Sequence, residues 1–273
     1  MSGSATGLDH VGVAVPELGA AAVEWQALGF TVQKLAAHMA GGAPTGTGNR
    51  NIMLRHGYIE LLATIDPARP SATLARFLAR HIGIHVLTLA MEDEAAALAR
   101  LGRAGFAASL AHSSRPADPD APEGPQAEFA RIPLADADPR LQLLRQVTPE
   151  LVWQERFLTH ANRAAALQGV VVAADPPAEF AARLARAAGL PLSPDPVGGY
   201  ALALPSATIR IVPPGAAAAL LAGAALPVLP CIAGLVVRTD DGNAAVRGLA
   251  GGVVRGDGTV VARASGVTVV FTP

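Results

Sequence analysis

The chain has 273 residues, a formal net charge of −1, 51% apolar residues and 16% charged residues. A nearly neutral chain lacks the basic surface that binds nucleic acid or anionic membranes, so neither is an expected partner. A single cysteine, Cys231, excludes an intrachain disulfide and thiolate zinc sites. The N-terminus shows no secretory pattern and no apolar run is long enough to cross a bilayer, which predicts a cytoplasmic protein.

A strand-like run, an amphipathic helix and a glycine recur four times along the chain. The runs start at Leu8, Gly83, Leu167 and Ile232, and the predicted helices cover 17–28, 92–104, 176–188 and 240–250. Glycine suits the position after a helix because the chain often turns there into a left-handed conformation. Four recurrences at nearly fixed spacing indicate an internal structural repeat.

Each predicted helix is followed by short extended runs instead of another strand–helix pair. The runs cover 30–35, 51–55 and 58–63; 106–111, 128–133 and 141–145; 190–193, 200–204 and 208–212; and 253–254, 259–262 and 267–271. Strict alternation of strands and helices would have indicated a doubly wound parallel sheet. This order instead predicts an α+β fold of four βαβββ modules, arranged as two paired-module domains.

The boundary between the two halves is predicted near Thr148. Thr148, Pro149 and Glu150 together are typical of a helix start, with an N-cap, a proline at the first position and an early acid. We therefore expect an N-terminal domain over 1–147, a connecting helix within 148–166 that runs over 151–166, and a C-terminal domain over 167–273. A shorter helix over 71–80 is expected to join the first two modules.

Several segments of the N-terminal half resemble bacterial glyoxalase-like domain proteins of the vicinal oxygen chelate superfamily. These segments are LDHV at 8–11, WQALGF at 25–30, GNR at 48–50 and GYIELL at 57–62. The superfamily includes glyoxalase I, extradiol dioxygenases and the bleomycin- and fosfomycin-resistance proteins. The resemblance implies that two modules form a cleft around a divalent metal ion.

In that superfamily the first and fourth strands of each module carry the metal ligands. The matching positions in this chain are His10, Glu60, His85 and Gln142. The resemblance thus implies one divalent ion, of zinc, nickel, manganese, cobalt or iron. Gln142 is the weakest member, because a neutral amide stands where the commonest glyoxalase pattern has a second glutamate. The competing interpretation is a pair of core histidines, with Glu60 salt-bridged to Arg50.

Weaker substrate contacts are expected from four further side chains, Asn49, Arg50, Tyr58 and Trp153. The Asn–Arg pair could clamp a carboxylate or phosphate, or could equally be a turn with a surface arginine. Trp153 could close the cleft, although packing of the connecting helix explains it as well. The matching ligand positions of the C-terminal half hold Gln168, Arg210, Ala233 and Thr268. These would not hold a divalent metal, so that half is expected to be structural.

The leading functional prediction is a metal-dependent lyase or isomerase acting on a small substrate with vicinal oxygens, with Glu60 as the base. One alternative is an extradiol-type dioxygenase, which also uses two histidines and one glutamate. Another alternative is a metal-free protein that binds or sequesters a small molecule, as resistance proteins do. Both modules of the cleft lie in one chain, so a homodimer is compatible with the site but not needed to complete it.

Overall fold

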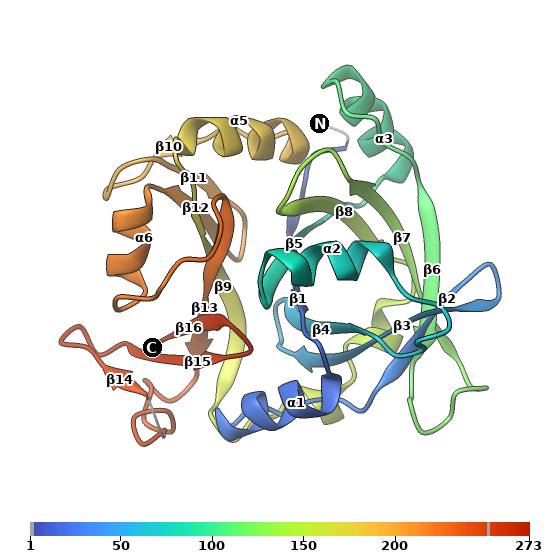
Figure 1. Ribbon diagram of the computed structural model, residues 1–273, viewed down its shortest axis with the longest axis horizontal. Coiled ribbons are helices and arrows are strands. Elements are labelled where there is room, and N and C mark those ends of the chain that lie inside the picture. Colours follow the sequence, from blue (N-terminus) through green and yellow to red (C-terminus); the bar gives the residue numbers. More distant parts are fainter. Residues whose placement is uncertain (1–2, 250–251) are drawn as a thin grey trace.

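The computed structural model describes residues 3–249 and 252–273, and in this part the four-module α+β fold is confirmed (Figure 1). The first module comprises β1 (Gly7–Ala14), α1 (Leu18–Ala27), β2 (Ala36–Ala40), β3 (Ala43–Met53) and β4 (Tyr58–Thr64). The second comprises β5 (Gly83–Ala90), α3 (Glu94–Arg103), β6 (Ala111–Pro116), β7 (Gln126–Leu134) and β8 (Arg140–Gln146). Between the two modules lies α2 (Ala72–Arg80).

The C-terminal half repeats the same strand order, with shorter second, third and fourth strands. The third module comprises β9 (Ala164–Ala173), α5 (Pro177–Ala188), β10 (Ser193–Pro194), β11 (Tyr200–Ala203) and β12 (Thr208–Val212). After α6 (Pro214–Leu220), the fourth comprises β13 (Cys231–Thr239), β14 (Val253–Val254), β15 (Val260–Ala264) and β16 (Val267–Thr272). The two halves lie side by side in Figure 1, and backbone pairing continues from one to the other through β5 and β13.

Four strands in the order β4–β1–β5–β8 form the centre of the N-terminal half. β1 runs parallel to β4 and antiparallel to β5, while β5 runs parallel to β8. Their apolar side chains on one face join a core that continues into the C-terminal half and includes Trp25, Phe30 and Phe271. The opposite face is left for polar side chains, because α2 covers only part of it (Figure 1).

The fourth module lacks its predicted helix over 240–250. Residues 240–249 form bends and turns, and Ala250 lies outside the described residues. Gly242 and Asn243 both have positive φ, of 63° and 70°, which a right-handed helix does not accommodate. The buried Asn243 amide donates to the carbonyls of Gly258 and Phe271, so tertiary hydrogen bonds outweigh the local helical pattern.

The predicted connecting helix over 151–166 is also wrong. Only α4 (Pro149–Val152) and a short 3-10 turn, η1 (Glu155–Phe157), form, and β9 already begins at Ala164. His160 and Asn162 are buried and bond to the first module, at the Met53 and Leu28 carbonyls respectively. These contacts hold the segment extended against the first module.

One further difference from the predicted elements affects the walls of the functional site. The segment between the expected runs 30–35 and 51–55 forms a β-hairpin, in which β3 starts at Ala43 and pairs with β2. Gly41 and Gly42 form the turn with φ of 57° and 77°, a conformation that suits the tight turns of hairpins. The hairpin forms one wall of the cleft that is described below. No helix within 3–249 and 252–273 is both long and apolar enough to cross a membrane.

Candidate functional site

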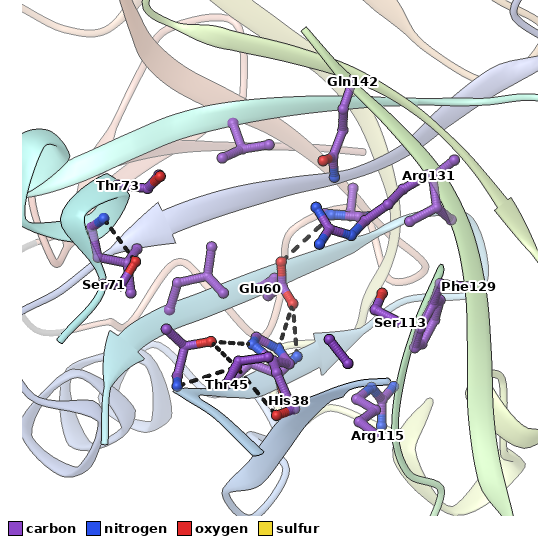
Figure 2. Close-up of a pocket in the computed structure, with 18 of the residues that line it drawn as sticks. His38, Thr45, Glu60, Ser71, Thr73, Ser113, Arg115, Phe129, Arg131 and Gln142 are labelled. Atoms are coloured by element: carbon purple, nitrogen blue, oxygen red, sulfur yellow. Dashed lines mark hydrogen bonds and ion pairs between the residues drawn. The ribbon is translucent and has the colours of Figure 1, made fainter. Parts of the chain in front are cut away.

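A cavity of about 330 Å³ lies on the polar face of the N-terminal half. Its walls come from β1, β3 and β4 on one side, from β6, β7 and β8 on the other, and from the start of α2. This volume suits a small organic molecule, and pockets of this kind usually combine apolar walls with a few placed polar groups. Figure 2 shows the polar side chains converging on Glu60.

Glu60 is the centre of the cavity's polar network. Its Oε1 accepts a hydrogen bond from Asn49 Nδ2 at 2.7 Å and lies 3.6 Å from His38 Nε2. Its Oε2 lies 3.5 Å from His10 Nε2, on the other side of the carboxylate. The side chain is 14% exposed, so the carboxylate can meet a bound molecule.

This network keeps Glu60 ionised. Burial by itself would raise the pKa of the Glu60 carboxyl, because desolvation disfavours the charge. The His38 hydrogen bond, the positive charge of His10 and His38, and the Asn49 hydrogen bond outweigh burial and lower the pKa to about 2. At neutral pH the floor of the cavity therefore carries one negative charge.

His10 is fixed in orientation on both of its ring nitrogens. Nδ1 lies 2.6 Å from Asp9 Oδ1, and Nε2 lies 2.9 Å from Thr88 Oγ1. The ring also stacks on Tyr58, with 4.4 Å between centroids. We assign the proton to Nδ1, where it is donated to the carboxylate, so that Nε2 accepts from the threonine hydroxyl. A carboxylate behind a histidine of this kind sets the tautomer and the ring orientation.

The second module places the buried Thr88 against His10, not His85. Thr88 pairs with His10 across β1 and β5, and Gln142 Nε2 donates to the Thr88 hydroxyl at 2.8 Å. Gln142 lines the cavity as expected and points into it (Figure 2). The second module thus contributes a hydroxyl and a neutral amide where the first contributes an imidazole and a carboxylate.

His85 lies apart from this group, so the predicted convergence of His10, Glu60 and His85 does not occur. The ring stacks on Phe77 at 4.7 Å, and Nε2 bonds to the His81 carbonyl at 2.8 Å. A register shift in the β1–β5 pairing falls at this position. His85 therefore packs beneath α2, where Phe77 belongs to a small apolar cluster with Leu74 and Val86.

The donor set does not fit the metal site that the resemblance implied. Across residues 3–249 and 252–273, no three His, Cys, Asp or Glu side chains are grouped to hold a metal ion. His10 Nε2 is engaged by Thr88, and the Gln142 amide is a neutral and weak ligand. Of the four ligands that the resemblance implied, only His10 and Glu60 lie together as strong ligands, and catalytic zinc sites use three protein ligands. His38 also faces Glu60 but lies beside the other carboxylate oxygen, and the three side chains are not grouped as a metal site. We therefore derive no chemical step through a metal ion.

The weaker predicted contacts divide into two groups. Asn49 and Tyr58 line the cavity. Arg50 lies outside it, with Nη1 3.4 Å from the Gln33 carbonyl, and it forms no ion pair with Glu60. Trp153 also lies outside, because its Nε1 donates to the Leu54 carbonyl at 3.0 Å, which matches the packing interpretation.

Four cavity residues have no counterpart in the sequence prediction: His38 on β2 and the arginines Arg115, Arg131 and Arg140 on β6, β7 and β8. His38 was expected in a loop, and the hairpin over β2 and β3 brings it to Glu60, with Nδ1 2.9 Å from Thr47 Oγ1. A signal for Arg131 does exist, since a charged residue interrupts an apolar strand between Phe129 and Pro133. No local pattern indicates that His38 faces the cavity.

Comparison with solved structures shows the fold alone. A hypothetical protein from Staphylococcus aureus aligns with a TM-score of 0.69 at 11% identity, covering 97% of this chain and 98% of that one. A mutant 4-hydroxymandelate synthase from Streptomyces coelicolor aligns with a TM-score of 0.58 at 16% identity, covering 87% and 72%. A Mn(II)-bound glyoxalase from Novosphingobium aromaticivorans aligns with a TM-score of 0.55 at 12% identity, covering 98% and 82%.

Among curated proteins no relative matches this chain. A family model described as glyoxalase-like domain matches residues 8–188, which is more than half of the chain and includes the whole first module pair. That match and the βαβββ architecture agree with the segments around His10 and Glu60. The chain belongs to the glyoxalase-like domain family of the vicinal oxygen chelate superfamily.

Proposed function

We propose that the cleft is the active site of a lyase or isomerase that moves a proton on a small substrate with two neighbouring oxygens, with Glu60 as the base. The observation that supports this most is an ionised carboxylate on the floor of a 330 Å³ cavity, with imidazole nitrogens 3.5 and 3.6 Å from its two oxygens. Such an arrangement can accept a proton and stabilise the charge that this leaves on the substrate.

The free enzyme holds Glu60 too acidic to be an effective base, so substrate binding must change its surroundings. The His38 contact is the first among those that lower the pKa of Glu60. A substrate oxygen that accepts the His38 Nε2–H removes this contact while the substrate excludes water. Burial then dominates, and the pKa of Glu60 rises in the complex. The carboxylate can take a proton from the adjacent carbon, while His38 donates to the oxygen on which negative charge develops.

The remaining polar side chains position this pair. Asn49 donates to one carboxylate oxygen, His10 Nε2 lies 3.5 Å from the other, and Asp9 fixes the His10 ring from behind. Proton transfer to Glu60 and hydrogen bonding by His38 involve only the substrate and side chains of the protein. The dioxygenase alternative requires a metal ion held by two histidines and a glutamate. His10, His38 and Glu60 meet in this cleft but are not grouped as a metal site, and we do not propose this alternative.

Exchange of carbon-bound hydrogen in D₂O tests the proposal without knowledge of the product. Small α-hydroxy ketones and α-hydroxy acids are incubated with the protein, and loss of the C–H signal next to the oxygens is followed by NMR. Glu60→Gln should slow exchange at least 10²-fold, the usual scale for loss of a positioned base. Glu94→Gln, which removes a carboxylate paired with Arg145 outside the cavity, is the matched control. Exchange by Glu60→Gln at the wild-type rate would disprove the role of Glu60.

A metal-free binding protein remains the second candidate, and one observation favours it. Thr88 and Gln142 are neutral and bonded to one another, so the second module adds no proton-transfer group. A binding protein would take up ligands from the same panel, detected by calorimetry, without hydrogen exchange in any of them. Exchange that depends on Glu60 would exclude this candidate.

A further inference from the structure

Three arginines on neighbouring strands line one side of the cavity: Arg115 on β6, Arg131 on β7 and Arg140 on β8. We refer to them as the arginine wall. Glu60 supplies the only carboxylate among the described residues that line this cavity. The three arginines and Glu60 together therefore give a net charge of +2. An excess positive charge of this size, in a site partly shielded from water, attracts anions.

Arg115 is the most deeply buried member of the wall. It is 3% exposed and lies over the Phe129 ring, 5.7 Å from the centroid. Nη1 makes one long hydrogen bond of 3.4 Å to the Pro116 carbonyl, and Nη2 is buried with no partner among residues 3–249 and 252–273. A buried guanidinium without a partner is costly, so such groups usually meet an anion.

Arg131 occupies the middle strand and extends toward Glu60 and Gln142 (Figure 2). It makes no side-chain hydrogen bond or salt bridge within the described part of the chain, although the charge of Glu60 acts on it and opposes the lowering of its pKa by burial. Arg140 reaches the Thr73 hydroxyl at 3.4 Å, and its Nε is buried and unpaired in the same described part. The charges of Arg131 and Arg140 also repel one another. An anion between them would relieve that repulsion.

Arginines elsewhere in the chain show what a satisfied guanidinium is like in this protein. Arg210 holds Asp195 through two nitrogens, at 2.7 and 2.6 Å. Arg183 holds Asp136 in the same way, at 3.0 and 2.8 Å. Arg210 and Arg183 each have a carboxylate partner, whereas no salt bridge to the arginine wall forms among the described residues.

We propose that the ligand of the cleft is a small organic anion, whose carboxylate or phosphate group is held by Arg131, with Arg115 and Arg140 on the two flanking strands. This inference rests on the proposed function, for which it names the substrate class. The ligand must have an organic part, because the cavity is larger than one anionic group and Leu62, Leu144 and Phe129 line it. With its charged group at Arg131, the neighbouring carbon faces Glu60.

Calorimetric titration tests this inference with three defined probes: glycolate, inorganic phosphate and ethylene glycol. Glycolate joins a carboxylate to a neighbouring hydroxyl, and ethylene glycol is its neutral counterpart. The wild-type protein should bind glycolate, phosphate or both at least about tenfold more tightly than ethylene glycol, as charge-assisted hydrogen bonds require. Preference between glycolate and phosphate identifies the anionic group. Equal affinity for glycolate, phosphate and ethylene glycol would overturn the proposal.

Single substitutions of arginine test which side chain holds the anion. Arg131→Gln should weaken binding of the preferred anion about tenfold or more, and Arg131→Lys should restore part of it. Arg156→Gln is the matched control, because Arg156 pairs with Asp118 outside the cavity. Circular dichroism confirms that Arg131→Gln is folded. Unchanged anion affinity in folded Arg131→Gln would overturn the proposal.

Glu60→Gln separates this inference from the proposed function. Removing the negative charge opposite the wall should tighten anion binding severalfold, whether or not Glu60 is a base. If Glu60→Gln loses hydrogen exchange while Arg131→Gln binds the anion normally, only the present inference fails. If Arg131 governs anion binding while Glu60→Gln exchanges hydrogen at the wild-type rate, only the proposed function fails.

Discussion

The two halves of this protein share one architecture, but the matching faces of their sheets carry different side chains, polar in the N-terminal half and apolar in the C-terminal half. In the N-terminal half that face surrounds a cavity with Glu60 at its floor. In the C-terminal half a cluster of apolar side chains occupies the sheet face next to α6, among them Val171, Leu221 and Ala233. The βαβββ pair therefore sets where a cleft can form, and side-chain chemistry decides whether the cleft stays open.

The two halves also differ in how the charges of their arginines are paired. Arg210 lies on β12, the fourth strand of the third module, and Asp195 neutralises its charge. The arginine wall of the N-terminal half has no salt-bridge partner among the described residues, so its charge is available to a ligand. The comparison indicates that the C-terminal pair is a structural support, while the N-terminal pair keeps polar groups at a cost in stability. The predictions below test this division.

The largest effect, a loss of stability, is expected from creating a cavity in the apolar face of the C-terminal half. Leu221 is fully buried and packs closely against Gly234. Leu221→Ala should reduce the free energy of unfolding by about 2–5 kcal/mol, the usual range for a buried leucine that leaves a cavity. Leu62→Ala, which enlarges an existing cavity, should cost less than half as much in the same chemical denaturation assay. Equal losses in both variants would contradict the division between a filled face and an open one.

A smaller and pH-dependent effect is expected at Arg210. Its hydrogen bonds are the main cause of the lowered pKa of Asp195. Arg210→Gln should reduce the free energy of unfolding at pH 7 by about 1–2 kcal/mol, a value discounted because Arg210 is 26% exposed. A carboxyl with a lowered pKa stabilises the fold above its unfolded value of about 3.9 and loses this contribution as pH falls through its folded value.

The difference between wild type and Arg210→Gln should therefore be complete at pH 7 and disappear in acid. Urea unfolding at a series of pH values measures it. Arg131→Gln is the counterpart from the arginine wall, and it should not destabilise the fold, because it removes a charge that has no salt-bridge partner. A constant difference for Arg210→Gln down to pH 2 would contradict the assignment of the Asp195 pKa to this pair.

His38 provides a test of the electrostatic network around Glu60. Because the His38 hydrogen bond lowers the pKa of Glu60 to about 2, wild-type exchange measured as kcat/KM should show no loss from Glu60 protonation between pH 5 and 8. His38→Ala removes that contact and should move the acid limb of the profile to higher pH, because burial then raises the pKa. His112→Ala, an exposed histidine on β6 outside this cavity, is the control. An unshifted acid limb would show that His38 does not act on Glu60.

The smallest functional effect is expected at His85. Since His85 packs between Phe77 and His81, away from Glu60, His85→Ala should lose about 1–3 kcal/mol of stability, as core changes typically do. Its hydrogen exchange and anion affinity should stay within about twofold of wild type, whereas His10→Ala should reduce both. Titration with Mn²⁺ adds an independent readout. Stoichiometric Mn²⁺ binding lost in both His10→Ala and His85→Ala would restore the three-ligand metal site and refute the arrangement described above.

The sequence by itself determined the module order, the family and two residues of the site. Repeats at fixed spacing indicate βαβββ units because each unit must bury its apolar face against a neighbour. His10 and Glu60, which the resemblance implied as ligand positions, both line the cavity, because side chains alternate between the two faces of a strand. Asn49, Tyr58 and Gln142 also line the cavity, from β3, β4 and β8.

Tertiary structure alone decided the rest. The register between β1 and β5 brings Thr88 to His10 and sends His85 to Phe77, and pairing register between strands 75 residues apart leaves no local pattern. The hairpin of β2 and β3 brings His38 to Glu60 because β3 pairs in turn with β4. The buried bonds of Asn243 and Asn162 replaced two predicted helices, because helix propensity is weak compared with buried hydrogen bonds. Local patterns therefore identified the elements, while long-range pairing selected the residues that meet in the cleft.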